Sequence, residues 1–194
     1  RSRPGTVVEV GGGTYGSQTI TSRASMRDLE PGCATESTSN CVVFRPARGA
    51  TVTIAGSLEV RGSSVWVQGT ASPTGGVPSA SRTYNIRITG YVDTEADSTS
   101  SYPDHVIFEG IHSTSFGAFG VDTATFRNMD VGPATVTSQG SGCYVKEGEG
   151  FENKIGFGRG ILVVPRNVVL DGLRIHNQNG DEGRIAGGCH WGGL

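Results

Sequence analysis

The chain of 194 residues is rich in glycine, with 31, and poor in charge, with 18% charged residues and a formal net charge of -2. Nucleic-acid-binding surfaces need clustered lysine and arginine, so this composition excludes nucleic acid as the expected partner. No apolar run approaches the roughly 20 residues that cross a bilayer, and we therefore expect no membrane insertion.

The first 41 residues are predicted to form an opening coil and a cap. A strand-like phrase begins within six residues of Arg1, and Arg23–Leu29 is a candidate for a short helical or irregular cap. Because Arg1 is not an initiator methionine, we expect any secretion signal to lie upstream of it.

From residue 65 onward the chain repeats one phrase, in which apolar residues alternate in twos on either side of a small residue. The small residues are Gly69, Gly90, Gly110, Asn128 and Gly172. Their first three separations are 21, 20 and 18 residues; the last, of 44 residues, holds either two units or one unit with an insertion. Such a period is typical of repeat architectures, whose units are too small to bury an apolar face alone.

Within each unit, the alternation and the abundance of Val, Ile and Phe indicate short strands rather than helices. A glycine or asparagine between two strands fits a corner, because these residues tolerate a positive φ. Coils of roughly twenty residues that stack at about 4.8 Å predict an all-β fold, a right-handed, single-stranded parallel β-helix of about six to seven coils. The side chains predicted to point inward are Val65, Val67, Ile86, Ile88, Val106, Phe108, Phe126, Val168 and Leu170.

Three phrases resemble the opening coils of pectate-lyase-like β-helix proteins, which have the pectin-lyase fold. They are Pro4–Tyr15, Val43–Ile54 and Leu58–Gly62. The resemblance covers nearly the whole chain and implies a fold, whereas chemistry has to be argued from a site. Classical pectate-lyase signatures are not matched, because the strand at Trp66 lacks the Asp-His pair and Arg45–Arg48 has a different spacing.

We expect residues 1–194 to form one β-helix domain, with 1–41 as the first coil and cap region and 42–194 as stacked coils. His190–Leu194 enters a further strand and stops. Such an end leaves an open strand edge, which repeat proteins normally cover. We therefore expect the natural protein to continue beyond Leu194.

The four cysteines fall into two pairs. Cys33 and Cys41 flank a short polar loop, while Cys143 and Cys189 occupy similar glycine-rich phrases. If the 44-residue separation is one unit, Cys143 and Cys189 lie about 4.8 Å apart on neighbouring coils, within disulfide range. We predict both disulfides and hence a secreted, extracellular protein; four buried thiols are the alternative.

One candidate polysaccharide site lies in residues 176–191, where acids, a cation, imidazoles and an aromatic ring are close in sequence. The candidate catalytic residues are Asp181, Glu182 and His190, because carboxylates and imidazoles transfer protons. The candidate substrate-binding residues are Arg184, Trp191 and Lys146, the last in a charged insertion at 146–154. Asp and Asn beside Gly are also ordinary turn residues, which is the alternative.

A second candidate site is for a metal ion. Asp93, Glu95 and Asp97 alternate along the chain as carboxylate ligands of a Ca²⁺ ion do. Ca²⁺ is therefore the one cofactor that the sequence suggests.

Two classes of function remain open. The resemblance implies an extracellular enzyme acting on a polysaccharide, either a lyase or a glycoside hydrolase. A lyase needs a base that removes the proton beside a uronate carboxylate and a cation that neutralises this carboxylate. The alternative is a non-catalytic secreted or surface β-helix that serves in glycan binding or adhesion.

Overall fold

The computed structural model describes residues 5–21, 33, 40–69, 83–95, 102–135, 156–158, 167–176 and 178–179. All regular secondary structure in these ranges is β-strand. Every strand pairing among them is parallel. The same ranges hold no helix of the length and apolar character that crossing a membrane requires.

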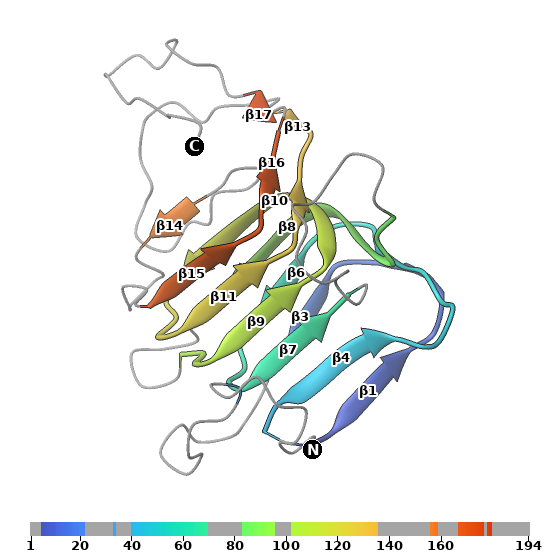
Figure 1. The fold of residues 1–194 in the computed structure, drawn as a ribbon, viewed down its shortest axis with the longest axis horizontal. Helices are drawn as coiled ribbons and strands as arrows, with labels where there is room; N and C mark the ends of the chain where they lie inside the picture. Colours follow the sequence, from blue (N-terminus) through green and yellow to red (C-terminus); the bar gives the residue numbers. More distant parts are fainter. Residues whose placement is uncertain are drawn as a thin grey trace.

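One sheet has six strands, and their spatial order is their order in the chain. They are β1 (Val7–Val10), β4 (Val42–Pro46), β7 (Val65–Gln68), β9 (Val106–Glu109), β11 (Ala124–Arg127) and β15 (Val168–Asp171). Figure 1 shows them stacked from blue to red, so each pass of the chain adds one strand at the same side.

The second sheet has nine strands. Its main path is β2 (Gly13–Tyr15), β5 (Val52–Ile54), β8 (Ile86–Thr94), β10 (Ile111–Phe119), β12 (Asp130–Val131) and β16 (Arg174–Ile175). Three further strands lie off this path: β3 (Gln18–Ile20), β6 (Leu58–Val60) and β14 (Gly156–Gly158). β3 pairs with β6, β6 also pairs with β8, and β14 pairs with β10. A separate pair joins β13 (Ala134–Thr135) to β17 (Gln178–Asn179). The chain thus visits the six-stranded and the nine-stranded sheet in turn.

Side chains from both large sheets pack into one apolar cluster. Because register aligns equal positions of successive passes, like residues stack: Phe108 pairs with Phe126, and their ring centroids lie 5.1 Å apart. Phe116 of the nine-stranded sheet packs on Phe126, at 4.8 Å between centroids. These contacts join the two sheets through the core.

Burial confirms most of the predicted inward residues. Seven of them are at most 5% exposed: Val65, Val67, Ile86, Ile88, Val106, Phe108 and Phe126. Val168 and Leu170 continue the inward ladders, since they pair in register with Ala124 and Phe126, but Val168 is only half-buried and Leu170 is 41% exposed. Both lie on β15, which is the last strand of its sheet, so no further strand among the described residues covers them.

The repeat frame needs one correction. Gly69, Gly110, Asn128 and Gly172 each follow a strand of the six-stranded sheet, but Gly90 lies inside β8 of the other sheet. The separations of 21 and 20 residues therefore belong to a single pass. The 44-residue separation is also one pass with an insertion, because β11 pairs directly with β15.

The predicted disulfide between Cys33 and Cys41 is confirmed, with Cα atoms 4.8 Å apart. Its two half-cystines are buried against Val43, Trp66 and Ile107, side chains of the six-stranded sheet that form a separate apolar cluster. The disulfide thus covers part of that sheet. Cys143 and Cys189 lie outside the described residues, so their pairing stays a prediction.

Phe108→Ala is expected to lower the free energy of unfolding by about 3–5 kcal/mol, because it removes a fully buried ring from the centre of the stack. Val169→Ala, at a side chain 49% exposed on β15, is the control and is expected to cost far less. Urea denaturation of both variants measures this difference; equal losses would contradict the assigned core.

Candidate functional site

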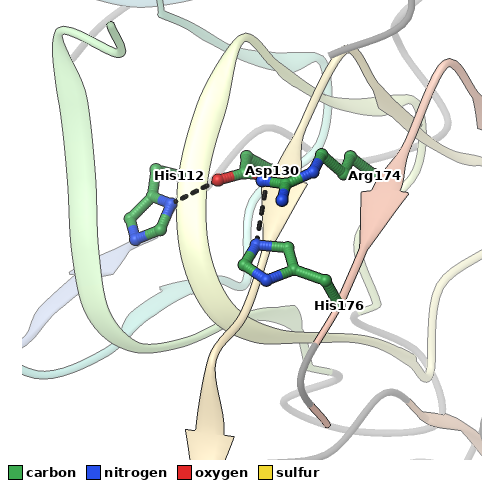
Figure 2. Close-up of polar contacts among 4 residues, drawn as sticks. All are labelled: His112, Asp130, Arg174 and His176. Atoms are coloured by element: carbon green, nitrogen blue, oxygen red, sulfur yellow. Dashed lines mark hydrogen bonds and ion pairs between the residues drawn. The ribbon is translucent and has the colours of Figure 1, made fainter. Parts of the chain in front are cut away.

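A polar cluster lies on the nine-stranded sheet where β10, β12 and β16 run side by side. His112 pairs in register with Asp130, and Asp130 pairs with Arg174. His176 follows Arg174 by two residues, and alternate residues of an extended chain share a side. Figure 2 shows the side chains of His112, Arg174 and His176 converging on Asp130. We call these four residues the His-Asp-Arg cluster.

The cluster faces outward, away from the apolar core. The neighbours of His112 in β10, Ile111 and Ser113, are both fully buried. Since successive side chains of a strand point to opposite faces, His112 lies on the outer face. Register places Asp130 and Arg174 on the same face.

Three equivalent corners place these residues at one level. His112, Asp130 and Arg174 each stand two positions after a corner residue. The corner residues have positive φ angles, which are 62° at Gly110, 52° at Asn128 and 59° at Gly172. Glycine and asparagine tolerate this conformation best, so the corner repeats in three successive passes.

Asp130 lies at the centre of the cluster. Its Oδ2 is 3.1 Å from His112 Nδ1, and its Oδ1 accepts a hydrogen bond of 2.8 Å from Arg174 Nη1. His176 Nε2 lies 3.3 Å from the same Oδ1. The Asp130 side chain is 10% exposed, against 17% for His112 and 29% for Arg174. The carboxylate therefore lies deepest, and the His112 and Arg174 side chains are more accessible.

This geometry prepares His112 for proton transfer. A carboxylate only accepts hydrogen bonds, so its contact with Nδ1 favours the tautomer that carries hydrogen there and leaves the Nε2 lone pair available. In Figure 2 the second ring nitrogen of His112 points away from Asp130. The ring of Tyr84, itself buried, lies 6.2 Å from the imidazole and is tilted by 40°. Asp130 and Tyr84 together restrict the orientation of the imidazole.

The charges around the cluster suit an anion. One carboxylate faces one guanidinium and two imidazoles, and a further cation, Arg87, pairs in register with His112 from β8. Two imidazoles and a carboxylate are also possible metal ligands. In the ranges that the structure describes, however, no three His, Cys, Asp or Glu side chains gather in a way that would hold a metal ion.

The site residues expected from sequence fall largely outside the described ranges. These are Asp181, Glu182, His190, Arg184, Trp191 and Lys146. Their roles stay predictions. Of the candidate segment at 176–191, the described part contributes His176 to the cluster.

Sequence reasoning missed His112, Asp130 and Arg174. Each belongs to a short strand segment that carries no recognisable catalytic motif. The signal that unites them is their common position two residues after Gly110, Asn128 and Gly172. An alignment of the passes on these corners places all three in one column.

The suggested Ca²⁺ ligands are only partly described. Asp93 and Glu95 are 5% and 8% exposed, and Asp97 lies outside the described ranges. Asp93 pairs in register with Glu59 of β6 and Gly117 of β10. Binding of Ca²⁺ through these carboxylates stays a prediction.

The environment of Asp93 favours its protonated form. Burial first, and then the charges of Glu59 and Glu95, raise the pKa of Asp93 to about 8, although Arg61 acts in the opposite direction. The buried Oδ1 of Asp93 has no hydrogen-bond partner among the described residues. A neutral carboxyl group is cheaper to bury than a charged one, which accounts for the direction of the shift.

No family model, no curated protein and no solved structure matches this chain significantly. The features that agree with the pectate-lyase-like resemblance are the all-β composition and the parallel strands in two sheets. The interpretation of the site therefore depends on its own geometry.

Asp93→Asn is expected to remove part of the pH dependence of stability. With a pKa of about 8 in the folded state and an ordinary pKa near 3.8 when unfolded, Asp93 holds its proton only in the folded state between these values. The contribution of Asp93 to the free energy of unfolding should therefore be largest below about pH 4. It should fall as the pH rises towards about 8.

Urea denaturation at about pH 5 and about pH 8 measures this effect. The Asp93→Asn variant should lose less stability between the two pH values than the native chain, by a few kcal/mol at most. Asp171→Asn, at an exposed carboxylate of β15, is the control and should keep the native pH dependence. The same pH dependence in all three chains would contradict a buried, neutral Asp93.

Proposed function

We propose that this protein is an extracellular, right-handed parallel β-helix of the pectate-lyase-like type that acts on or binds a polysaccharide. One observation supports the fold, and another supports the extracellular location. Each pass adds one parallel strand to the six-stranded sheet and one to the main path of the nine-stranded sheet, in chain order. The Cys33–Cys41 disulfide agrees with an oxidising compartment and hence with secretion.

The observation that carries the functional proposal is the outward His-Asp-Arg cluster. Enzymes that cleave acidic polysaccharides by elimination need a base and a cation that can both reach the reacting sugar. His112, oriented by Asp130, supplies the base. Arg174 supplies the cation. It lies two strands from His112 and in the same register row.

The proposed reaction is β-elimination on a uronate sugar. His112 Nε2 takes the proton from the carbon beside the uronate carboxylate, and Asp130 stabilises the imidazolium that forms. The electron pair of the broken C–H bond forms a carbon–carbon double bond, and the glycosidic oxygen leaves and takes a proton from water. Arg174 stabilises the negative charge that accumulates on the carboxylate during proton removal.

Hydrolysis fits the cluster less well. Most glycoside hydrolases use two carboxyl groups on either side of the scissile bond, one as acid and one as base or nucleophile. The cluster contains one carboxylate, and Asp130 is already held by His112 and Arg174. Asp130 is thus placed to orient its neighbours rather than to attack a sugar.

A non-catalytic glycan-binding or adhesion function is the second candidate. The observation in its favour is the bond of 2.8 Å between Arg174 and Asp130, which fixes the guanidinium before any ligand arrives. Preorganised polar groups lower the entropic cost of binding, and this advantage does not require that the ligand be cleaved. The same surface would then hold a polysaccharide without cleaving it.

The test is a screen of acidic and neutral polysaccharides for binding, by isothermal titration calorimetry, and for cleavage, by the ultraviolet absorbance of unsaturated products. Ca²⁺ or EDTA is included in parallel, which also tests the suggested metal. The account predicts that His112→Ala abolishes cleavage, by at least about a hundredfold, while binding persists. His105→Ala is the matched control, since His105 precedes β9 in the other sheet and contacts Asp104.

Each outcome of this screen decides something. Cleavage that survives in His112→Ala places the base elsewhere, and loss in His105→Ala would indicate a general folding defect. Binding without cleavage by the native chain supports the adhesion function. A native chain that neither binds nor cleaves any of the polysaccharides overturns the proposal.

A further inference from the structure

We infer that the ligand lies across the strands of the nine-stranded sheet, along one row of outward side chains, with Arg87 as the residue that selects an anionic sugar. The inference rests on the proposed function and adds to it a direction of binding, a length and a specificity residue. From the first pass to the last, the row consists of Thr14, Thr53, Arg87, His112, Asp130 and Arg174.

The row is continuous in the hydrogen-bonded register. Thr14 of β2 pairs with Thr53 of β5, Thr53 with Arg87 of β8, and Arg87 with His112 of β10. Five steps between neighbouring strands, each of about 4.8 Å, give the row a length of about 24 Å. The His-Asp-Arg cluster is therefore one end of a longer polar surface.

The row faces solvent along most of its length. Thr53 lies between Val52 and Ile54, and Arg87 lies between Ile86 and Ile88. These four apolar neighbours are at most 6% exposed, so Thr53 and Arg87 point to the opposite face. Thr14 and Arg87 are exposed and Thr53 is half-buried, which leaves all three accessible to a ligand.

Arg87 differs from the other arginine of the row. Arg174 donates to Asp130, whereas Arg87 has neither an ion-pair partner nor a side-chain hydrogen bond among the described residues. It stands next to His112 on the side away from Asp130. A guanidinium binds carboxylate or sulfate through two parallel N–H groups, so Arg87 fits an anionic group held beside the base.

The two threonines extend the row with neutral hydroxyl groups. Neither Thr14 nor Thr53 uses its side chain in a hydrogen bond to another described residue. A hydroxyl group both donates and accepts, which suits the hydroxyl groups of a sugar. Because one sugar of an extended chain advances by about one strand spacing, the row accommodates about five sugar units, with the reacting sugar over His112 and a neighbouring anionic sugar over Arg87.

The experiment is calorimetric titration of the native chain with oligosaccharides from dimer to hexamer in three series. Oligogalacturonates carry carboxylates, carrageenan oligosaccharides carry sulfates, and cello-oligosaccharides are neutral. We expect at least one charged series to bind with an affinity that rises with length and levels off near five units. The series that binds identifies which anionic group Arg87 selects.

Two outward substitutions test the neutral and the charged part of the row. Arg87→Gln should weaken binding of the charged series about tenfold and leave the neutral series unchanged. Thr53→Glu should weaken the longer charged oligosaccharides and spare the dimers, which need only the charged part. Thr125→Glu is the matched control, since Thr125 lies on β11 of the six-stranded sheet, and should bind as the native chain does.

Several results overturn the inference. Affinity that does not change beyond the dimer, or native affinity in both Arg87→Gln and Thr53→Glu, refutes the row. Binding of the neutral series alone refutes selection by Arg87 but leaves polysaccharide binding intact. Failure of all three series to bind overturns the inference together with the proposed function. Urea denaturation of each variant verifies that a loss of affinity is not a loss of folding.

Discussion

Parallel pairing in register is the constraint on which the rest of this structure depends. Hydrogen bonds between neighbouring strands hold equal positions of successive passes about 4.8 Å apart. A shift by one residue would turn every side chain of a strand to the opposite face, so the register is specified by the core that it buries. Phe108 and Phe126 stack inside because of it, and His112 and Asp130 meet outside for the same reason.

The outward side chains that this register aligns differ between the two sheets. On the six-stranded sheet, Glu109 accepts hydrogen bonds from Trp66 Nε1 at 3.0 Å and from Arg127 Nη2 at 3.1 Å, and the Arg127 guanidinium lies 5.5 Å from the Trp66 ring centroid. These side chains pair with one another, which is typical of a structural cluster. On the nine-stranded sheet, the row from Thr14 to Arg174 instead presents a guanidinium and hydroxyl groups outward. The difference supports a ligand-binding role for the second surface only.

The sequence was sufficient for the strands and most of the core, because alternation in twos is a local pattern. It was not sufficient to decide which phrases belong to the same sheet. The apolar phrase around Gly90 looks like those around Gly69 and Gly110, but it belongs to the other sheet. The cluster was missed for a related reason: residues that meet across strands are separated by 18 and 44 positions, and only the correct phase aligns them. The exposure of Leu170 depends on its place at the end of a sheet, which local sequence does not encode.

Cross-linking of engineered cysteine pairs tests the register most directly. Residues in register on neighbouring strands are about 4.8 Å apart, whereas a pair displaced by two positions is about 7–8 Å apart. Dibromobimane fluoresces strongly only after it bridges two close thiols. It should therefore link the pair Thr53→Cys and Arg87→Cys and fail to link the pair Thr53→Cys and Thr89→Cys. The fluorescence of the labelled native chain is subtracted as background. Equal labelling of both pairs, or preferential labelling of the displaced pair, would contradict the row that the account places on this sheet.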